Sequence, residues 1–234
     1  MLVKKLVVGL LSAYLSVGLV QAADNDTRDW ANMARYNSDN VALINSPNLQ
    51  NRIVFMGDSI TDFWSKTVPE QFLNKPYINR GISGQTAPQM LVRFRSDVIS
   101  LQPETVIILA GTNDIAGNSG PESNDMITGY IASMAELAKL HHINVVLSSL
   151  LPAKAYYWNP EIKPIERISA LNKWLRSYAS RNDYTYIDYY TPMVDENMGL
   201  KKEYSEDGVH PNAAGYAIMI RLAEKAIHDA SQAK

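Results

Sequence analysis

The sequence predicts an α/β protein, a three-layer α/β/α sandwich around a central, mostly parallel sheet of five strands. The first observation is a series of short apolar runs rich in Val, Ile and Tyr. They lack polar alternation, which is typical of strands buried on both faces. The second is that amphipathic helical patterns separate these runs, as in a doubly wound sheet with right-handed crossovers. The third is the absence of a Pro/Gly/Ser-rich linker, which favours a single domain in a chain of 234 residues.

Five segments have the composition of buried strands, the second being the weakest: Ile53–Met56, Tyr77–Asn79, Thr105–Ala110, Val145–Leu150 and Tyr184–Ile187. Three stretches between or after them repeat apolar residues at helical spacing. The first contains Ile127, Tyr130, Ile131, Met134, Leu137 and Ala138, the second Ile165, Ile168, Leu171, Leu175 and Tyr178, and the third Tyr216, Met219, Ile220, Ala223 and Ile227.

The N-terminus has the pattern of a secretory signal. Lys4 and Lys5 precede the uncharged run Leu6–Val20, and small residues up to Ala22 offer a cleavage site. We therefore expect a signal peptide at residues 1–22, a single domain at 23–234, and a periplasmic or secreted protein. The alternative is an uncleaved anchor, for which the run is short against the ~20 residues that span a bilayer.

The composition excludes several classes of function. The formal net charge of −2 gives no long-range attraction to nucleic acid or to an anionic membrane. The chain has no Cys, which excludes disulfides, a Cys nucleophile and a lipid-modified Cys. Because no metal-ligand pattern is present, we expect neither a metal nor another cofactor.

Polar residues follow the predicted strands, at the edge of the sheet where active sites of this architecture lie. Ser59 stands in a strand-to-helix turn, where its hydroxyl is exposed or, alternatively, where the motif only caps the helix. Gly81 and Gly84 flank the next turn and either bring a backbone N–H close to a ligand or form an ordinary turn. Asn113 follows the third strand and offers a side-chain amide, or a local turn hydrogen bond.

Near the C-terminus, Asp207 precedes His210 by three residues. At that spacing a carboxylate can hold one imidazole nitrogen and leave the other free as a base. The alternative is an isolated loop histidine. His141 and His142 lie at a predicted helix end, and His228 lies near the C-terminus, so His210 is the best candidate for a base.

Four blocks in this order resemble the GDSL/SGNH hydrolases: GDSI at 57–60, GISGQT at 81–86, GTND at 111–114 and DGVHP at 207–211. The resemblance implies a flavodoxin-like fold and a serine esterase that works through an acyl-enzyme. It makes Ser59 the nucleophile, His210 the base and Asp207 the partner of His210. It also implies an oxyanion hole formed by Ser59, Gly84 and Asn113. Ile60 replaces the usual Leu, which is a conservative exchange.

The substrate is less well defined by the sequence. Tyr156, Tyr157 and Trp158 follow the fourth strand and either border the substrate or cover the next helix, while Trp64 is expected in the core. No long apolar lid is present, which counts against a lipase acting on lipid aggregates.

The chain also looks like bacterial carbohydrate acetylesterases and is similar in its blocks to the platelet-activating-factor acetylhydrolase-like subgroup. These resemblances imply a glycan or small-molecule acetyl ester as substrate. The alternatives are a broad esterase, a thioesterase or a lysophospholipase, and, from another class, a noncatalytic glycan-binding protein.

Overall fold

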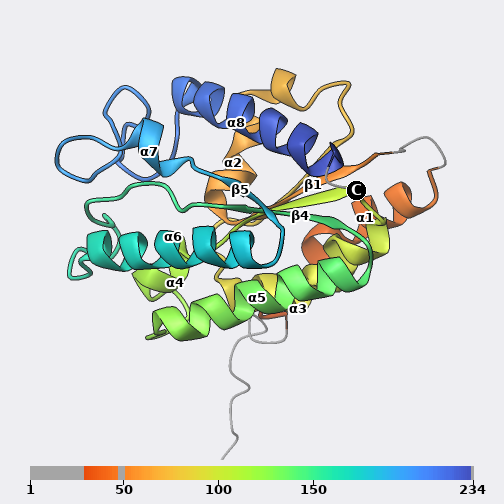
Figure 1. Cartoon of the computed structure of the whole chain (residues 1–234), viewed down its shortest axis with the longest axis horizontal. Helices are drawn as coiled ribbons and strands as arrows, with labels where there is room; N and C mark the ends of the chain where they lie inside the picture. Colours follow the sequence, from red (N-terminus) through yellow and green to blue (C-terminus); the bar gives the residue numbers. More distant parts are fainter. Residues whose placement is uncertain (1–28, 47–50, 233–234) are drawn as a thin grey trace, which may run out of the picture.

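The computed structural model describes residues 29–46 and 51–232 of the chain. Its five strands form one sheet in the order β2-β1-β3-β4-β5, and all neighbouring strands are parallel (Figure 1). The strands are β1 (Ile53–Gly57), β2 (Tyr77–Gly81), β3 (Thr105–Leu109), β4 (Asn144–Ser148) and β5 (Thr185–Ile187). The predicted fold and all five predicted strands are therefore confirmed, with ends that differ by no more than two residues.

Helices connect the strands, as the periodicity predicts. The α-helices are α1 (Asn37–Ile44), α2 (Ser59–Thr67), α3 (Ala87–Asp97), α4 (Thr112–Ala116), α5 (Asn124–Leu140), α6 (Pro164–Arg181), α7 (Tyr190–Met193) and α8 (Ala213–Gln232). Short 3-10 helices are η2 (Met33–Tyr36), η3 (Pro69–Gln71) and η4 (Ile99–Leu101). None of the helices in the described part of the chain is long and apolar enough to cross a membrane. The predicted signal peptide at 1–22 lies outside the described residues.

Helices cover both faces of the sheet and make three layers (Figure 1). Strand β1 shows why, because its alternate residues enter two different cores. Ile53 and Phe55 pack with α2 and α8, and the buried Trp64 of α2 lies in this core as predicted. Val54 and Met56 pack with α3, α5 and α6 on the opposite face. Both faces of the central strands are thus removed from water, which is what a parallel sheet requires.

The strand order sets the position of the candidate site. From β1 the chain crosses to β2 on one side and then returns to β3 on the other side of β1. The loops that leave the carboxyl ends of β1 and β3 therefore diverge, and ligands of doubly wound sheets bind in the crevice that results. The turns after β1, β2 and β3 hold the first three of the four sequence blocks.

A buried guanidinium joins the ends of β1 and β2. Arg93 of α3 is fully buried, and it donates to the carbonyl oxygens of Gly57 and Arg80 at 3.1 and 2.9 Å. Its Nε donates to Gln85 Oε1 at 2.6 Å, and its Nη1 pairs with Asp97 at 2.8 Å. One side chain thus holds the backbone that leads into two of the loops, and its charge is balanced one helical turn away.

We expect Arg93→Lys to lower the free energy of unfolding by about 2–4 kcal/mol, because each buried acceptor left unpaired costs about 1–3 kcal/mol. A lysine keeps the charge but has one nitrogen, which cannot reach all four acceptors. Urea denaturation measures the change. The control is Arg95→Lys on the exposed face of the same helix, which should be neutral. An equal effect of the two substitutions would contradict this role.

Candidate active site

The turn after β1 presents Ser59 as the first residue of α2. Asp58 caps the helix by accepting a hydrogen bond from the Ile60 N–H at 2.9 Å. Gly57 is required by close packing, because a Cβ there would lie 2.1 Å from Thr61 Oγ1. Ser59 is 9 % exposed, and its N–H is one of the first four of the helix, which have no intrahelical acceptor. Hydroxyl and N–H are therefore both available to a ligand.

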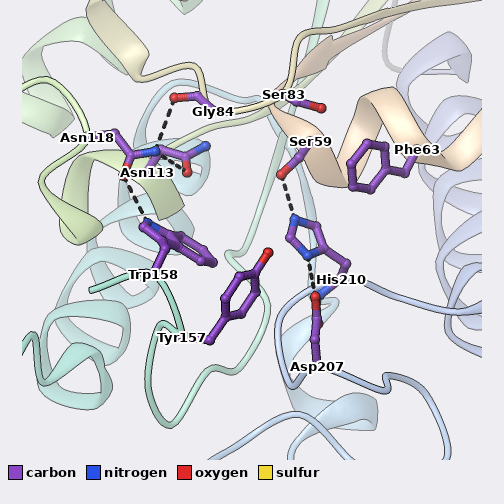
Figure 2. A pocket seen from close by; sticks show the side chains of 10 residues that line it. All are labelled: Ser59, Phe63, Ser83, Gly84, Asn113, Asn118, Tyr157, Trp158, Asp207 and His210. Carbon is purple, nitrogen blue, oxygen red and sulfur yellow. Dashed lines mark hydrogen bonds and ion pairs between the residues drawn. The ribbon is translucent and has the colours of Figure 1, made fainter. Parts of the chain in front are cut away.

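An imidazole from the other end of the chain contacts this hydroxyl. His210 Nε2 lies 2.8 Å from Ser59 Oγ, and His210 Nδ1 lies 2.7 Å from Asp207 Oδ2 (Figure 2). An ionised carboxylate can only accept hydrogen bonds, so Nδ1 of the neutral ring bears the hydrogen. Nε2 is then free to accept the Ser59 proton.

The loop around Asp207 keeps that carboxylate in place. Asp207 Oδ1 accepts hydrogen bonds from the N–H groups of Val209 and His210 at 2.9 and 2.8 Å. Burial alone would raise the pKa of Asp207, but the hydrogen bonds from the His210 ring and the two N–H groups outweigh it and lower the pKa. The buried Ser205 donates to the His210 carbonyl at 2.8 Å and closes the loop. Asp207 therefore stays ionised beside the imidazole.

The turn after β2 brings Gly84 to the same pocket. The Gln85 N–H donates to the Ile82 carbonyl at 3.2 Å, and Gly84 within this turn has a φ of +79°. This left-handed conformation favours glycine. No atom within 4 Å would meet a Cβ on Gly84, so the backbone is open to the pocket. The positive φ, and not a lack of space, therefore explains a glycine at this position.

Asn113 lies in α4, directly after β3, and is buried. Its Nδ2 donates to the Gln85 carbonyl at 3.0 Å, which leaves the second hydrogen of the amide unused by that contact. The neighbouring Asp114 accepts a hydrogen bond from the Ala87 N–H at 2.8 Å and so joins α4 to the start of α3. Ser59, Gly84 and Asn113, the three candidates for an oxyanion hole, thus line one pocket.

The pocket has a volume of about 340 Å³. Figure 2 shows the Ser59–His210–Asp207 chain on one side and Gly84 and Asn113 on the other. Its complete lining is Ser59, Phe63, Ser83, Gly84, Asn113, Asn118, Tyr157, Trp158, Asp207 and His210. The structure therefore brings all five catalytic and oxyanion candidates of the sequence to one pocket.

Two of the three aromatic residues that were predicted to border the substrate line the pocket. Tyr157 and Trp158 line the pocket and are 65 % and 37 % exposed. The prediction is wrong for Tyr156, which is fully buried and does not line the pocket. Its ring lies beneath Trp158 at a centroid distance of 5.0 Å, and it supports that wall instead of facing a ligand.

Three residues at or near the site were not identified from the sequence motifs. Phe63 packs its ring 5.2 Å from the His210 ring, and its place four residues after Ser59 on one helix could have indicated this. Asn118 stands four residues after the GTND block and contacts Asn113. Arg93 is a charged residue on the buried side of an amphipathic helix, which is itself a signal of a buried polar network.

No group of His, Asp and Glu side chains in residues 29–46 and 51–232 could hold a metal ion. The chemistry that this pocket offers is that of a hydroxyl, an imidazole, a carboxylate and N–H donors.

Comparison with known proteins gives the class of this fold and site. The model of the GDSL-like lipase/acylhydrolase family matches residues 55–218, and the chain belongs to this family. The family comprises acyl hydrolases, and esterase chemistry agrees with the groups in the pocket.

Particular relatives refine this comparison. The crystal structure of a GDSL-like lipase from Bacteroides thetaiotaomicron is 48 % identical, with a TM-score of 0.83, over 86 % of this chain and 99 % of that one. An acetylxylan esterase from Geobacillus stearothermophilus is 27 % identical over 153 residues, 62 % of this chain and 68 % of its own length. The uncharacterized lipoprotein YqeF from Bacillus subtilis (strain 168) is 28 % identical over 144 residues, 54 % of this chain and 59 % of its own length.

Asp58 introduces a pH dependence of stability. Its carboxyl is buried, and this burial raises the pKa to about 6 against the partly compensating hydrogen bond from Ile60. The unfolded chain loses this proton near its ordinary pKa of 3.8, and the folded chain keeps it to about 6. Stability therefore falls as pH rises through this window, and the loss is complete above it.

We expect Asp58→Asn to raise the free energy of unfolding at pH 8 by up to about 3 kcal/mol, since a pKa unit corresponds to about 1.4 kcal/mol. At pH 3.5 the gain should vanish, because Asn still caps α2 and the wild-type carboxyl is neutral in the folded state. Urea denaturation at both pH values measures the difference. Asp183→Asn, on the surface, is the control without a pH-dependent gain. An identical gain at both pH values would rule out the carboxyl as its source.

Proposed function

We propose that this protein is a serine esterase that hydrolyses acetyl esters of carbohydrate through an acyl-enzyme. The observation that supports the chemistry is the hydrogen-bonded series from Asp207 through His210 to Ser59, beside the N–H donors of Gly84 and Asn113. A noncatalytic glycan-binding protein would not need an ordered proton acceptor on a serine hydroxyl.

In the proposed reaction, Ser59 Oγ attacks the ester carbonyl carbon while His210 Nε2 takes the hydroxyl proton. The oxyanion accepts hydrogen bonds from the N–H groups of Ser59 and Gly84 and from the Asn113 amide, each worth about 3 kcal/mol in the transition state. His210 then gives its proton to the leaving alcohol. Water then attacks the acyl carbon while His210 takes one of its protons. The bond between the acyl carbon and Ser59 Oγ breaks, His210 returns the proton to Oγ, and the carboxylic acid leaves. Asp207 stabilises the imidazolium at each step.

A hollow beside the pocket supports the proposal that the alcohol part of the ester is a sugar. A second hollow of about 420 Å³ shares Ser83 and Gly84 with the pocket. Its far side is lined by Trp30, Asn32 and Gln89, and Trp30 is 49 % exposed. An exposed indole beside polar groups suits a sugar ring, which has apolar faces and hydroxyl edges. The acetylxylan esterase relative supports the same substrate class.

We also propose that the protein is exported to the periplasm or secreted, with its signal peptide cleaved after Ala22. The charged start, the uncharged run at 6–20 and the similarity to a lipoprotein support export. A lipid anchor on cysteine is not available to this chain, because it has no Cys. Its partner is then a glycan or small-molecule acyl ester, without nucleic acid and without stable membrane insertion.

Ser59→Ala should reduce hydrolysis of 4-nitrophenyl acetate by about 10³-fold or more, because the nucleophile is lost. Labelling by a fluorophosphonate should be lost with it, and the melting temperature should remain close to the wild-type value. The exposed Ser100 provides the control, since Ser100→Ala should be labelled like the wild type. Full turnover or labelling of Ser59→Ala would remove Ser59 from the mechanism.

The substrate proposal predicts a kcat/KM that is highest for acetate in a series of aryl esters from acetate to octanoate. On acetylated xylo-oligosaccharides, Trp30→Ala should raise KM about 10-fold, a loss of about 1.4 kcal/mol. The KM for 4-nitrophenyl acetate should not change, because this ester does not reach the second hollow. Met33→Ala, in the same segment but outside the hollow, is the control. A maximum at octanoate would favour a broad esterase or lysophospholipase, and preferred thioester cleavage a thioesterase.

A further inference from the structure

Asn118 lies at the junction of the oxyanion donors and the pocket wall. It follows α4, and its Nδ2 donates to Asn113 Oδ1 at 2.8 Å and to the Gly84 carbonyl at 3.3 Å. Its Oδ1 accepts a hydrogen bond from Trp158 Nε1 at 3.0 Å (Figure 2). One amide thus contacts acceptor oxygens of both residues that complete the proposed oxyanion hole, together with an aromatic side chain that lines the pocket.

The Trp158 N–H at one end, and the Gly84 and Gln85 carbonyls at the other, determine the direction of each hydrogen bond made by the Asn118 and Asn113 amides. An indole N–H can only donate, so Trp158 must meet the oxygen of Asn118. The carbonyls of Gly84 and Gln85 can only accept, so they must meet the nitrogens of Asn118 and Asn113. Neither amide can exchange its oxygen and nitrogen without placing donor against donor or acceptor against acceptor.

This fixed polarity matters for Asn113 because its function depends on which end of the amide faces the substrate. Asn118 holds the Asn113 oxygen and Gln85 takes one of the two Asn113 hydrogens. The second hydrogen is left for a ligand oxygen. A turned amide would direct its oxygen at the oxyanion and replace a stabilising contact by a repulsive one.

We propose that Asn118 is a positioning residue, which orients the Asn113 amide toward the oxyanion and depends for its own orientation on Trp158. The inference rests on the proposed esterase function. It gives Trp158 two tasks, since the ring forms the pocket wall and the N–H fixes the oxyanion donors. A substrate that packs against the Trp158 ring thereby also holds the donor series in place.

The first test compares two substitutions of Asn118 in 4-nitrophenyl acetate hydrolysis. Asn118→Ala should lower kcat about 10- to 100-fold and leave KM within about 3-fold, because removal of a whole oxyanion donor costs about 10²–10³. Asn118→Asp should be slower still, although it has nearly the same shape, because its second oxygen would face the Asn113 and Gly84 oxygens. A residue that only fills space would give the opposite order. Asn124→Ala, on α5 beyond the pocket, is the control with wild-type kinetics.

A double-mutant cycle separates positioning from a direct contact. If Asn118 acts through Asn113, the kcat of Asn113→Ala should fall by less than about 3-fold when Asn118→Ala is added. Trp158→Phe retains the ring and removes only the N–H, so it should lower kcat about 3- to 10-fold without raising KM. Trp158→Ala should also raise KM, because the wall is lost. If Asn118→Ala does not fold, Trp158→Phe replaces it in the cycle.

A kcat for Asn118→Ala within about 2-fold of the wild type, or full additivity with Asn113→Ala, would overturn the proposal. An Asn118→Asp variant as active as the wild type would do the same. These results would leave the esterase proposal intact, provided that Ser59 is still labelled and wild-type turnover is normal. Loss of the esterase proposal would instead appear as an unlabelled, inactive wild-type protein.

Discussion

The buried guanidinium of Arg93 is the contact on which the geometry of the pocket depends. Strands β1 and β2 end side by side, next to the switch point between β1 and β3, and each is followed by a turn that leads into a helix. Arg93 contacts the carbonyls of Gly57 and Arg80 at these ends, and the side chain of Gln85 beyond them. The turn that presents Ser59 and the turn after β2 therefore share one rigid support, although 20 or more residues of chain separate them.

Two buried carboxylates near the pocket fix the positions of helix starts at a cost in the stability of the fold. Asp58 and Asp114 each use one carboxylate oxygen to accept a hydrogen bond from a backbone N–H at the start of a helix. The other Asp58 oxygen is buried without a partner, and the Asp114 carboxyl lies beside that of Glu122. Burial raises the pKa of both groups, so their ionised forms weaken the fold near neutral pH. These contacts position the segments that carry Ser59 and Asn113. Functional sites commonly lower the stability of a fold in this way.

The strands, the helices and the edge of the sheet that carries the candidate site could be predicted from the sequence. Contacts made by side chains in the loops could not. Apolar runs and helical periodicity indicate strands and helices because both depend on local spacing. The rule that sites lie at strand ends then places Ser59 and Asn113 together. In a loop no periodicity says which ring is buried, so Tyr156 and Trp158 could not be distinguished. Asn118 also contacts Gly84 and Trp158, which lie on segments distant in sequence, and no local pattern contains these two contacts.

The proposed chemistry and the proposed specificity come from different parts of the molecule. The reacting groups stand on turns fixed by buried hydrogen bonds, such as those of Arg93 and Asp114. The walls come from exposed aromatic side chains, namely Tyr157 and Trp30, whose rings have large exposed fractions. Such walls can change among relatives without disturbing the reacting groups, which explains why a family model does not define a substrate. Trp158 is the exception, because its N–H is bonded to Asn118, which contacts Asn113, while its ring faces the pocket. If Asn118 has the proposed role, a change of wall at Trp158 also alters the orientation of the proposed oxyanion donors.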